Sequence, residues 1–234
     1  MKNRNYSQGR VSQYDLLRIV SPFYNILHEK LASFIGESFQ KQFKLKVLDL
    51  GCGTGFTSSK ILEKLPDVNL TLVDRNSAMV EQAKQGLRSH KGQIEFICED
   101  GLESLKKLED NSFDLVVSAL TLHNVKSKRR LEYLREINRV LVKGGIFLNA
   151  DKYLSGDDSQ IQIDLNFHLA CLDKIKDFGY SELSVEWRNH YEQDMEKERV
   201  MYLDKSLNDL KVAGFSNIQE YYKNHMFAVV VAEK

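Results

Sequence analysis

The chain has 234 residues with a hydrophobic content of 42%, a length that suits one domain with appendages. Its 33 basic and 33 acidic side chains cancel, which leaves no broad positive field for sequence-independent binding of nucleic acid. No spacing of the cysteines indicates a disulfide framework or a metal site, and no apolar stretch approaches the roughly 20 residues of a membrane span, so we expect a soluble, cytoplasmic protein without a metal or a membrane partner.

The first two-thirds of the chain alternates between helical and extended patterns. Residues 14–35 predict a helix around Pro22. Apolar, β-branched runs then predict strands over residues 45–50, 70–74, 94–97, 113–117 and 145–148. Apolar residues at helical spacing predict helices between these strands, over residues 56–65, 78–87, 102–108 and 131–141. This alternation indicates βαβ units and a mostly parallel sheet with helices on both faces.

The last part of the chain departs from this alternation. Residues 159–212 are nearly free of strand patterns and predict two or three helices, whereas residues 218–222 and 226–231 flank a short turn and predict an antiparallel hairpin. The expected fold is α/β: a Rossmann-like, seven-stranded, mostly parallel sheet with an antiparallel C-terminal hairpin. The single domain divides into an N-terminal helical lid (1–43), an α/β core (44–151), a helical insertion (152–213) and the terminal hairpin (214–234).

A glycine-rich turn with Gly51, Gly53 and Gly55 follows the first predicted strand directly. Glycine permits a positive φ and lets a ligand approach the backbone, and amides at the start of the next helix can hold polar groups. The turn is G-x-G-x-G rather than the G-x-G-x-x-G of dinucleotide enzymes, and Asp49 precedes it by two residues. It resembles the first motif, (D/E)-x-G-x-G-x-G, of the class I S-adenosylmethionine-dependent methyltransferases. The alternative is a turn that is rich in glycine for packing alone.

Acidic residues follow the second and third strands. Asp74 closes the second strand, where nucleotide-binding proteins place an acid that accepts hydrogen bonds from ribose hydroxyls, and Arg75 flanks it. After the third strand, Asp100 and Gly101 resemble the methyltransferase motif that meets the adenine. Each acid has a purely structural alternative as a helix cap.

The fourth strand continues through Ser118 to a turn with His123, and the next helix ends at Gly144 and Gly145. This order also resembles class I methyltransferases. The resemblance implies S-adenosyl-L-methionine as cofactor and S-adenosyl-L-homocysteine as product. The cofactor-binding residues that we predict on this basis are Asp49, Gly51, Cys52, Gly53, Gly55, Asp74, Arg75, Asp100, Gly101 and Ser118, with Tyr24 added from the N-terminal segment.

Methyl transfer is an in-line displacement in which the protein mainly positions the acceptor, so a general base is dispensable. His123 lies just beyond the fourth strand, where open α/β sheets place their ligand crevice, and is the candidate base. Alternatively, it forms a wall of the pocket or satisfies a loop carbonyl. The lid and the insertion should cover the crevice. Their candidate pocket residues are Tyr14, Arg18, Tyr180 and Arg188, for which ordinary packing is the alternative.

Residues 179–183, 187–188 and 213–215 resemble carboxy-S-adenosylmethionine synthase, a family of tRNA wobble-uridine modification. In that family an arginine pairs with the extra carboxylate of the cofactor, and Arg188 occupies the matching place; a surface pair with Glu186 or Glu192 is the alternative. The first motif of that family lacks the regular glycine pattern found here. The main hypothesis is therefore methyl transfer to a small molecule, with carboxy-cofactor chemistry as an alternative.

An RNA methyltransferase is a further alternative, for which the basic run Lys126, Lys128, Arg129 and Arg130 is the candidate contact. Such a run is usually a solvated helix start. Residues 118–122 do not match the Asp/Asn-Pro-Pro-aromatic signature of exocyclic amino methylases. A non-catalytic module that binds the cofactor is the third hypothesis. We expect a monomer or a homodimer.

Overall fold

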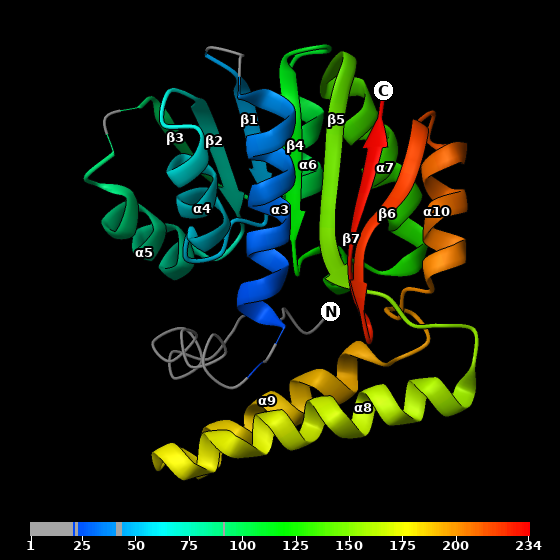
Figure 1. Cartoon of the computed structure of the whole chain (residues 1–234). Coiled ribbons are helices and arrows are strands. Elements are labelled where there is room, and N and C mark those ends of the chain that lie inside the picture. The colour runs from blue at the N-terminus through cyan, green and yellow to red at the C-terminus, as the bar shows by residue number, and fades with distance from the viewer. Residues whose placement is uncertain (1–20, 22, 41–43, 91) are drawn as a thin grey trace.

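A seven-stranded sheet in the order β3-β2-β1-β4-β5-β7-β6 forms the centre of the molecule (Figure 1). The computed structural model describes residues 21, 23–40, 44–90 and 92–234. The parallel strands are β1 (Lys46–Leu50), β2 (Asn69–Asp74), β3 (Ile94–Cys98), β4 (Phe113–Ala119) and β5 (Leu141–Lys152). The hairpin of β6 (Ser216–Asn224) and β7 (Phe227–Glu233) joins β5 in antiparallel fashion. The predicted fold class is confirmed.

Helices cover both faces of the sheet and enclose two hydrophobic clusters. One layer consists of α3 (Tyr24–Phe39), α4 (Phe56–Lys64) and α5 (Ser77–Leu87), and the other of α6 (Gly101–Lys107), α7 (Ser127–Val140) and α10 (Leu203–Val212). Alternation along β1 divides its side chains between the two: Val47 packs with the first layer, whereas Leu48 and Leu50 pack with the second. Both faces of the central strands β1 and β4 are therefore largely buried, as their continuous apolar runs predict.

The fifth strand is longer than the sequence pattern indicates. It begins at Leu141, where the predicted helix was expected to end, and runs to Lys152. The register against β4 shifts between Phe113 and Leu115, and Gly144 takes a φ of 75°, which accommodates the extra residues. The far end of the strand, residues 149–152, includes the polar residues Asn149, Asp151 and Lys152, so it does not form an apolar run in the sequence. All four residues are nevertheless buried.

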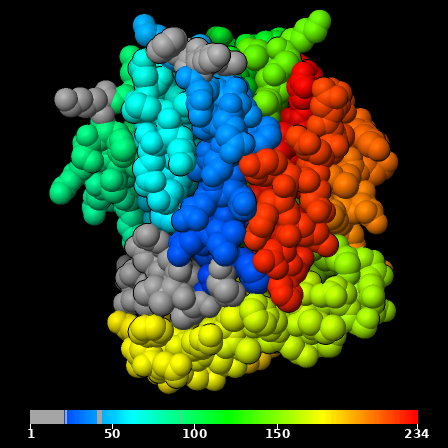
Figure 2. Space-filling view, viewed as in Figure 1, coloured from blue at the N-terminus to red at the C-terminus, as the bar shows by residue number. Residues whose placement is uncertain are grey.

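The helical insertion crosses the carboxyl ends of the parallel strands. It consists of α8 (Asp158–Asp173), the short 3₁₀ helix η3 (Lys174–Phe178) and α9 (Ser181–Asp194). Figures 1 and 2 show it as a yellow-green to yellow band across the lower end of the molecule, below α3. By contrast, α10 packs against α7 and β6 in the helix layer of the sheet, although the sequence placed it within the insertion.

Two findings concern the described residues as a whole. None of the described helices is both long and apolar enough to cross a lipid bilayer. Within the same part of the chain, no group of three or more histidine, cysteine, aspartate and glutamate side chains has an arrangement that could hold a metal ion.

Candidate active site

The glycine turn after β1 has one glycine that the fold requires and one that leaves space for a ligand. Gly51 has a φ of 79°, and a Cβ built there would lie 2.3 Å from the side chain of Thr121. Gly53 has a φ of 53°, yet a Cβ there would meet nothing within 4 Å. Gly55, with a φ of 80°, is the N-cap of α4. The turn is therefore tight against the chain on one side and open on the other, as a ligand cradle requires.

Asp49 lies beneath this turn, and its carboxylate is buried. Ser58 Oγ donates to Oδ2 over 2.6 Å, whereas Oδ1 has no hydrogen-bond partner. Burial raises the pKa of Asp49 to about 7, and the nearby Asp74 carboxylate adds to this effect while the Ser58 hydroxyl opposes it. A buried carboxylate oxygen without a partner is costly, and a ligand's ammonium group is the kind of partner that would compensate it.

Asp74 lies at the end of β2 beside the glycine turn. Its carboxylate accepts hydrogen bonds from the Gly53 amide over 3.0 Å and from the Asn76 amide over 2.8 Å. Burial raises the pKa of Asp74, against the lowering effect of these two amides. Asn76 rather than Asp74 caps α5, and the neighbouring Arg75 is exposed. The structural alternative for Asp74, a cap of the following helix, is thus already filled by another residue.

Other predicted cofactor residues lie along the same edge of the sheet. Asp100 follows β3 and caps α6 by accepting from the Leu102 amide over 3.1 Å. Ser118 is fully buried near the end of β4, and its Oγ has no hydrogen-bond partner. Cys52 is buried in the glycine turn, and Gly101 begins α6. Because β3, β2, β1 and β4 are neighbours, their carboxyl ends bring these residues to one edge.

A cavity that is partly open to solvent is lined by residues at the carboxyl ends of β4 and β5 and by residues of the α8–α9 insertion. Its polar walls are His123, Lys152, His168, His190, Asp194 and Ser21. Its apolar and aromatic walls are Tyr24, Leu120, Leu172, Trp187, Tyr191 and Phe227. The cavity has the mixed polar and apolar lining of a small-molecule site.

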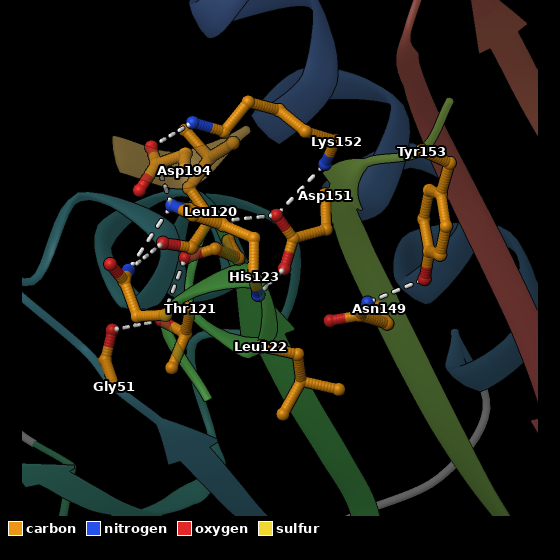
Figure 3. Close-up of polar contacts among 12 residues, drawn as sticks. Gly51, Leu120, Thr121, Leu122, His123, Asn149, Asp151, Lys152, Tyr153 and Asp194 are labelled. Carbon is orange, nitrogen blue, oxygen red and sulfur yellow. Dashed lines mark hydrogen bonds and ion pairs between the residues drawn. The ribbon is translucent and has the colours of Figure 1, made fainter. Parts of the chain in front are cut away.

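His123 belongs to the short 3₁₀ helix η2 (Leu122–Asn124) and is held by Asp151 of β5 (Figure 3). His123 Nδ1 lies 2.6 Å from Asp151 Oδ1, and the His123 amide donates to Oδ2 over 3.2 Å. Burial alone would raise the pKa of Asp151, but His123 and the charge and amide of Lys152 outweigh it, so the pKa is lowered. The lowered pKa favours an ionised Asp151, which fixes the ring through Nδ1, and Asn124 Nδ2 lies 3.1 Å from Nε2.

A second ion pair joins the sheet to the insertion. Lys152 Nζ lies 2.6 Å from Asp194 Oδ2, and the same oxygen lies 3.6 Å from His123 Nε2. Lys152 Nζ also lies 4.5 Å from the ring centre of Tyr191. Burial would raise the pKa of Asp194, but the charges of Lys152, His123 and His190 outweigh it and hold the carboxyl ionised.

The buried Arg130 fixes the turn that carries His123. Its guanidinium donates to the carbonyl oxygens of Leu122 and Val125 in that turn. It also donates to those of Arg199 and Val200, in the segment that follows α9. One side chain therefore ties the His123 turn to the end of the insertion.

Two members of the basic run beside Arg130 have acidic neighbours within the protein, whereas Lys128 is exposed. Lys126 pairs with Glu198, and Arg129 lies 4.0 Å from Asp100 and 3.9 Å from Glu103. The expectation of a solvated helix start is thus wrong for Arg130, which is buried. The run does not present a set of uncommitted charges to a polyanion.

Of the predicted substrate-pocket residues, the structure describes only Tyr180 and Arg188. Tyr14 and Arg18 are outside the described residues. Tyr180 precedes α9 with 40% of its surface exposed, and Arg188 pairs with Asp173 of α8 over 2.5 Å rather than with Glu186 or Glu192. Neither Tyr180 nor Arg188 is among the described residues that line the cavity.

Tyr24 does line the cavity, where its ring packs on His28 and Phe56. The residues that sequence reasoning missed are Asp151, Lys152, His168 and Asp194. The only local signal was a run of polar residues directly after an apolar strand, at the end of β5. Positions 168 and 194 reach the cavity only through the course of the insertion, which no local pattern describes.

The fold and this site define an enzyme class. A mostly parallel sheet with a glycine turn after β1, an acid at the end of β2 and a cavity at the carboxyl edge is the arrangement of Rossmann-like enzymes that bind a nucleoside-containing cofactor. The open side of Gly53, the unpartnered Oδ1 of Asp49 and the unpartnered Oγ of Ser118 show that the edge has room and polar groups for such a cofactor.

Comparisons with known proteins specify the class. The family model described as a methyltransferase domain matches residues 47–145. The carboxy-S-adenosyl-L-methionine synthase of Nautilia profundicola is 26% identical over 227 residues, which cover 94% of this chain and 89% of that protein. The malonyl-[acyl-carrier protein] O-methyltransferase 2 of Ilyobacter polytropus is 30% identical over 196 residues, covering 79% of this chain and 70% of that protein.

Among solved structures, the CurJ carbon methyltransferase superimposes with a TM-score of 0.67 at 17% identity, which concerns the fold; the match covers 94% of this chain and 58% of that chain. The chain belongs to the family of S-adenosylmethionine-dependent methyltransferases and is an enzyme that uses S-adenosylmethionine.

The raised pKa of Asp49 predicts a pH-dependent stability. A carboxyl whose folded pKa lies above its unfolded value stabilises the fold fully below the unfolded pKa and loses that contribution as the pH rises through about 7. Between pH 5 and pH 8.5, the Tm of the wild type should therefore fall by several degrees relative to that of Asp49→Asn, in the absence of cofactor. Thermal unfolding followed by circular dichroism measures this difference, with the exposed Asp67→Asn as matched control. A pH-independent difference between wild type and Asp49→Asn would contradict the assignment.

Proposed function

We propose that this enzyme transfers a methyl group to a small molecule in the cavity, as a cytoplasmic enzyme, with His123 as general base and Asp151 as its positioning residue. The observation that carries the proposal is the continuity of the two sites. Thr121 Oγ1 donates to the Gly51 carbonyl oxygen over 3.1 Å, and His123 follows two residues later on the cavity wall. The cradle and the cavity therefore share one segment of chain.

The residues at the sheet edge divide the binding of the cofactor among them. The open backbone at Gly53 provides the surface on which the cofactor lies. Asp49 Oδ1 is suited to the ammonium of its amino-acid end, with Ser118 nearby on β4, and Asp74 to the ribose hydroxyls. Asp100, Gly101 and Arg75 are assigned to the adenine end. When bound, S-adenosylmethionine supplies a methyl group already attached to a sulfonium leaving group.

The protein's own contribution to the chemistry is proton removal and placement. The attacking group of the acceptor replaces the side-chain amide of Asn124 as the hydrogen-bond partner of His123 Nε2. His123 Nε2 then takes the proton of that group. Asp151 then stabilises the imidazolium through the 2.6 Å contact at Nδ1. The aromatic walls, including Trp187 and Tyr191, exclude water from the acceptor.

Carboxy-cofactor chemistry is the second candidate function. It is favoured by relatives named carboxy-S-adenosyl-L-methionine synthase, one of which aligns with 94% of this chain. The engagement of Arg188 with Asp173, away from the cavity wall, ranks it below methyl transfer. RNA as acceptor ranks lower because three of the four basic side chains of the run, Lys126, Arg129 and Arg130, contact groups of the protein itself. A non-catalytic module ranks last, because the cavity beside the cradle is open.

Removal of the Asp74 carboxylate should weaken cofactor binding. The charge-assisted hydrogen bonds of a carboxylate to ribose hydroxyls are worth about 1.5–3 kcal/mol each. Asp74→Ala should therefore raise the Kd for S-adenosylhomocysteine by an order of magnitude or more, measured by isothermal titration calorimetry, with Asp67→Ala as control. Unchanged affinity in a folded Asp74→Ala protein would remove Asp74 from the site.

Removal of the His123 imidazole should slow turnover without weakening cofactor binding. His123→Gln should lower kcat by about 10²–10⁴-fold, the usual contribution of a general base. The assay is release of S-adenosylhomocysteine with an acceptor found in a metabolite screen, and the loss should grow as the acceptor becomes less acidic. His90→Gln, in the loop before β3 at the opposite end of the sheet, is the matched control. A His123→Gln enzyme with wild-type kcat would exclude the base role.

The two candidate functions differ in the cofactor that the protein retains. Mass spectrometry of ligand that co-purifies with the protein should find S-adenosylmethionine or S-adenosylhomocysteine. Recovery of the carboxylated form would instead favour the second candidate and give Arg188 a role to be tested by Arg188→Gln.

A further inference from the structure

Lys152 is the only lysine or arginine among the described residues that line the cavity. It stands at the last position of β5 and is almost entirely buried. A buried ammonium group is expensive unless it is paired, and its three N–H groups exceed what one carboxylate oxygen can accept. The N–H groups of Lys152 that Asp194 does not accept are therefore donors that a ligand in the cavity could use.

Lys152 is the more accessible member of the Lys152–Asp194 pair. The side chain of Lys152 is 10% exposed and that of Asp194 is 1% exposed. Asp194 Oδ2 accepts from Lys152 Nζ, whereas the second carboxylate near Lys152, Asp151, is occupied by His123 Nδ1. The pair thus offers donors to the cavity and keeps its acceptors covered.

His168 adds an uncharged group on the same wall. Its ring stacks on Tyr191 with 4.1 Å between centres, and its Nδ1 has no hydrogen-bond partner. Burial lowers the pKa of His168 to about 3, and the charge of Lys152 acts in the same direction. A neutral imidazole beside the ammonium leaves a ring nitrogen that can donate to an oxygen in one tautomer.

One part of the cavity wall is large and apolar. Trp187, Tyr191 and Phe227 face the cavity together with Leu120 and Leu172. A ligand that satisfies both parts of this cavity combines an anionic oxygen group with an apolar or aromatic body. An amine would place a second cation beside Lys152 without a free carboxylate to compensate it.

We propose that the acceptor of this enzyme is an apolar or aromatic carboxylic acid, whose carboxylate is held by Lys152 Nζ with His168 beside it. The inference rests on the proposed function in taking the cavity as the acceptor site. The inference goes beyond the proposed function by assigning a negative charge to the acceptor and by naming Lys152 as the residue that selects this charge.

The single tryptophan of the chain, Trp187, lines the cavity and reports on its occupancy. Tryptophan fluorescence at constant pH is therefore followed while the wild-type protein, saturated with S-adenosylhomocysteine, is titrated with phenylacetate, phenylacetamide or phenethylamine. These probes share one body and differ in charge. Phenylacetate should bind at least about tenfold more tightly than the amide, which corresponds to about 1.4 kcal/mol, and the amine should bind most weakly.

The variant that tests Lys152 removes both members of the pair. Lys152→Met alone leaves Asp194 buried without its partner and risks unfolding, so the double variant Lys152→Met/Asp194→Asn is used alongside it. In the double variant the preference for phenylacetate over phenylacetamide should disappear, while the affinity for S-adenosylhomocysteine stays within a factor of about two. Lys205→Met, on the exposed face of α10, is the matched control.

Three outcomes overturn the inference: equal affinity of wild type for the acid and the amide, no response to phenylacetate, or a preference that survives in the double variant. Its failure is distinguishable from failure of the proposed function. Methyl transfer to an uncharged acceptor without any preference for acids would overturn only the inference. Selective acid binding in a protein that never releases S-adenosylhomocysteine would overturn only the methyl transfer.

Discussion

The ion pair between Lys152 and Asp194 determines how the insertion lies over the sheet. The two groups are 2.6 Å apart and come from the last residue of β5 and the last residue of α9. Transferring two such charges from water costs several kcal/mol for each ion, and the cost is offset only when the geometry is good and further partners are present. Tyr191 and His123 provide those partners. The end of α9 is therefore confined to the neighbourhood of β5, and the cavity takes its shape from that confinement.

The two halves of the site are also joined through the backbone. Thr121 packs against Gly51 so closely that the turn tolerates no side chain there, and Arg130 holds the residues on either side of His123 by their carbonyl oxygens. A displacement of the glycine turn would thus move the segment that carries His123. This coupling explains why the buried Arg130, with no role in the chemistry itself, is positioned with four carbonyl groups around it.

The cofactor half of the site could be predicted from the sequence because its residues are local to strand ends. Asp49, Gly51 and Asp74 each follow or end an apolar strand, and parallel strands bring their carboxyl ends to one edge whatever the rest of the chain does. The sheet, its hairpin and the order of helices were predictable for the same reason. The boundaries of the elements were less predictable. The strand β5 continues through Asn149, Asp151 and Lys152, which are buried by the tertiary structure although they are polar.

The acceptor half could not be predicted because its chemistry depends on residues distant in sequence. The local sequence gives no reason to expect Lys152 inside the protein. Its burial depends on the ion pair with Asp194, which lies at the end of the insertion, 42 residues later. Tyr180 and Arg188 occur in the same insertion, but their positions along it direct them away from the cavity. A sheet edge that we propose to hold the cofactor and an insertion that lines the proposed acceptor cavity can change independently. The polarity of the walls, set here by one accessible ammonium and one neutral imidazole, therefore carries the information on substrate that the glycine turn lacks.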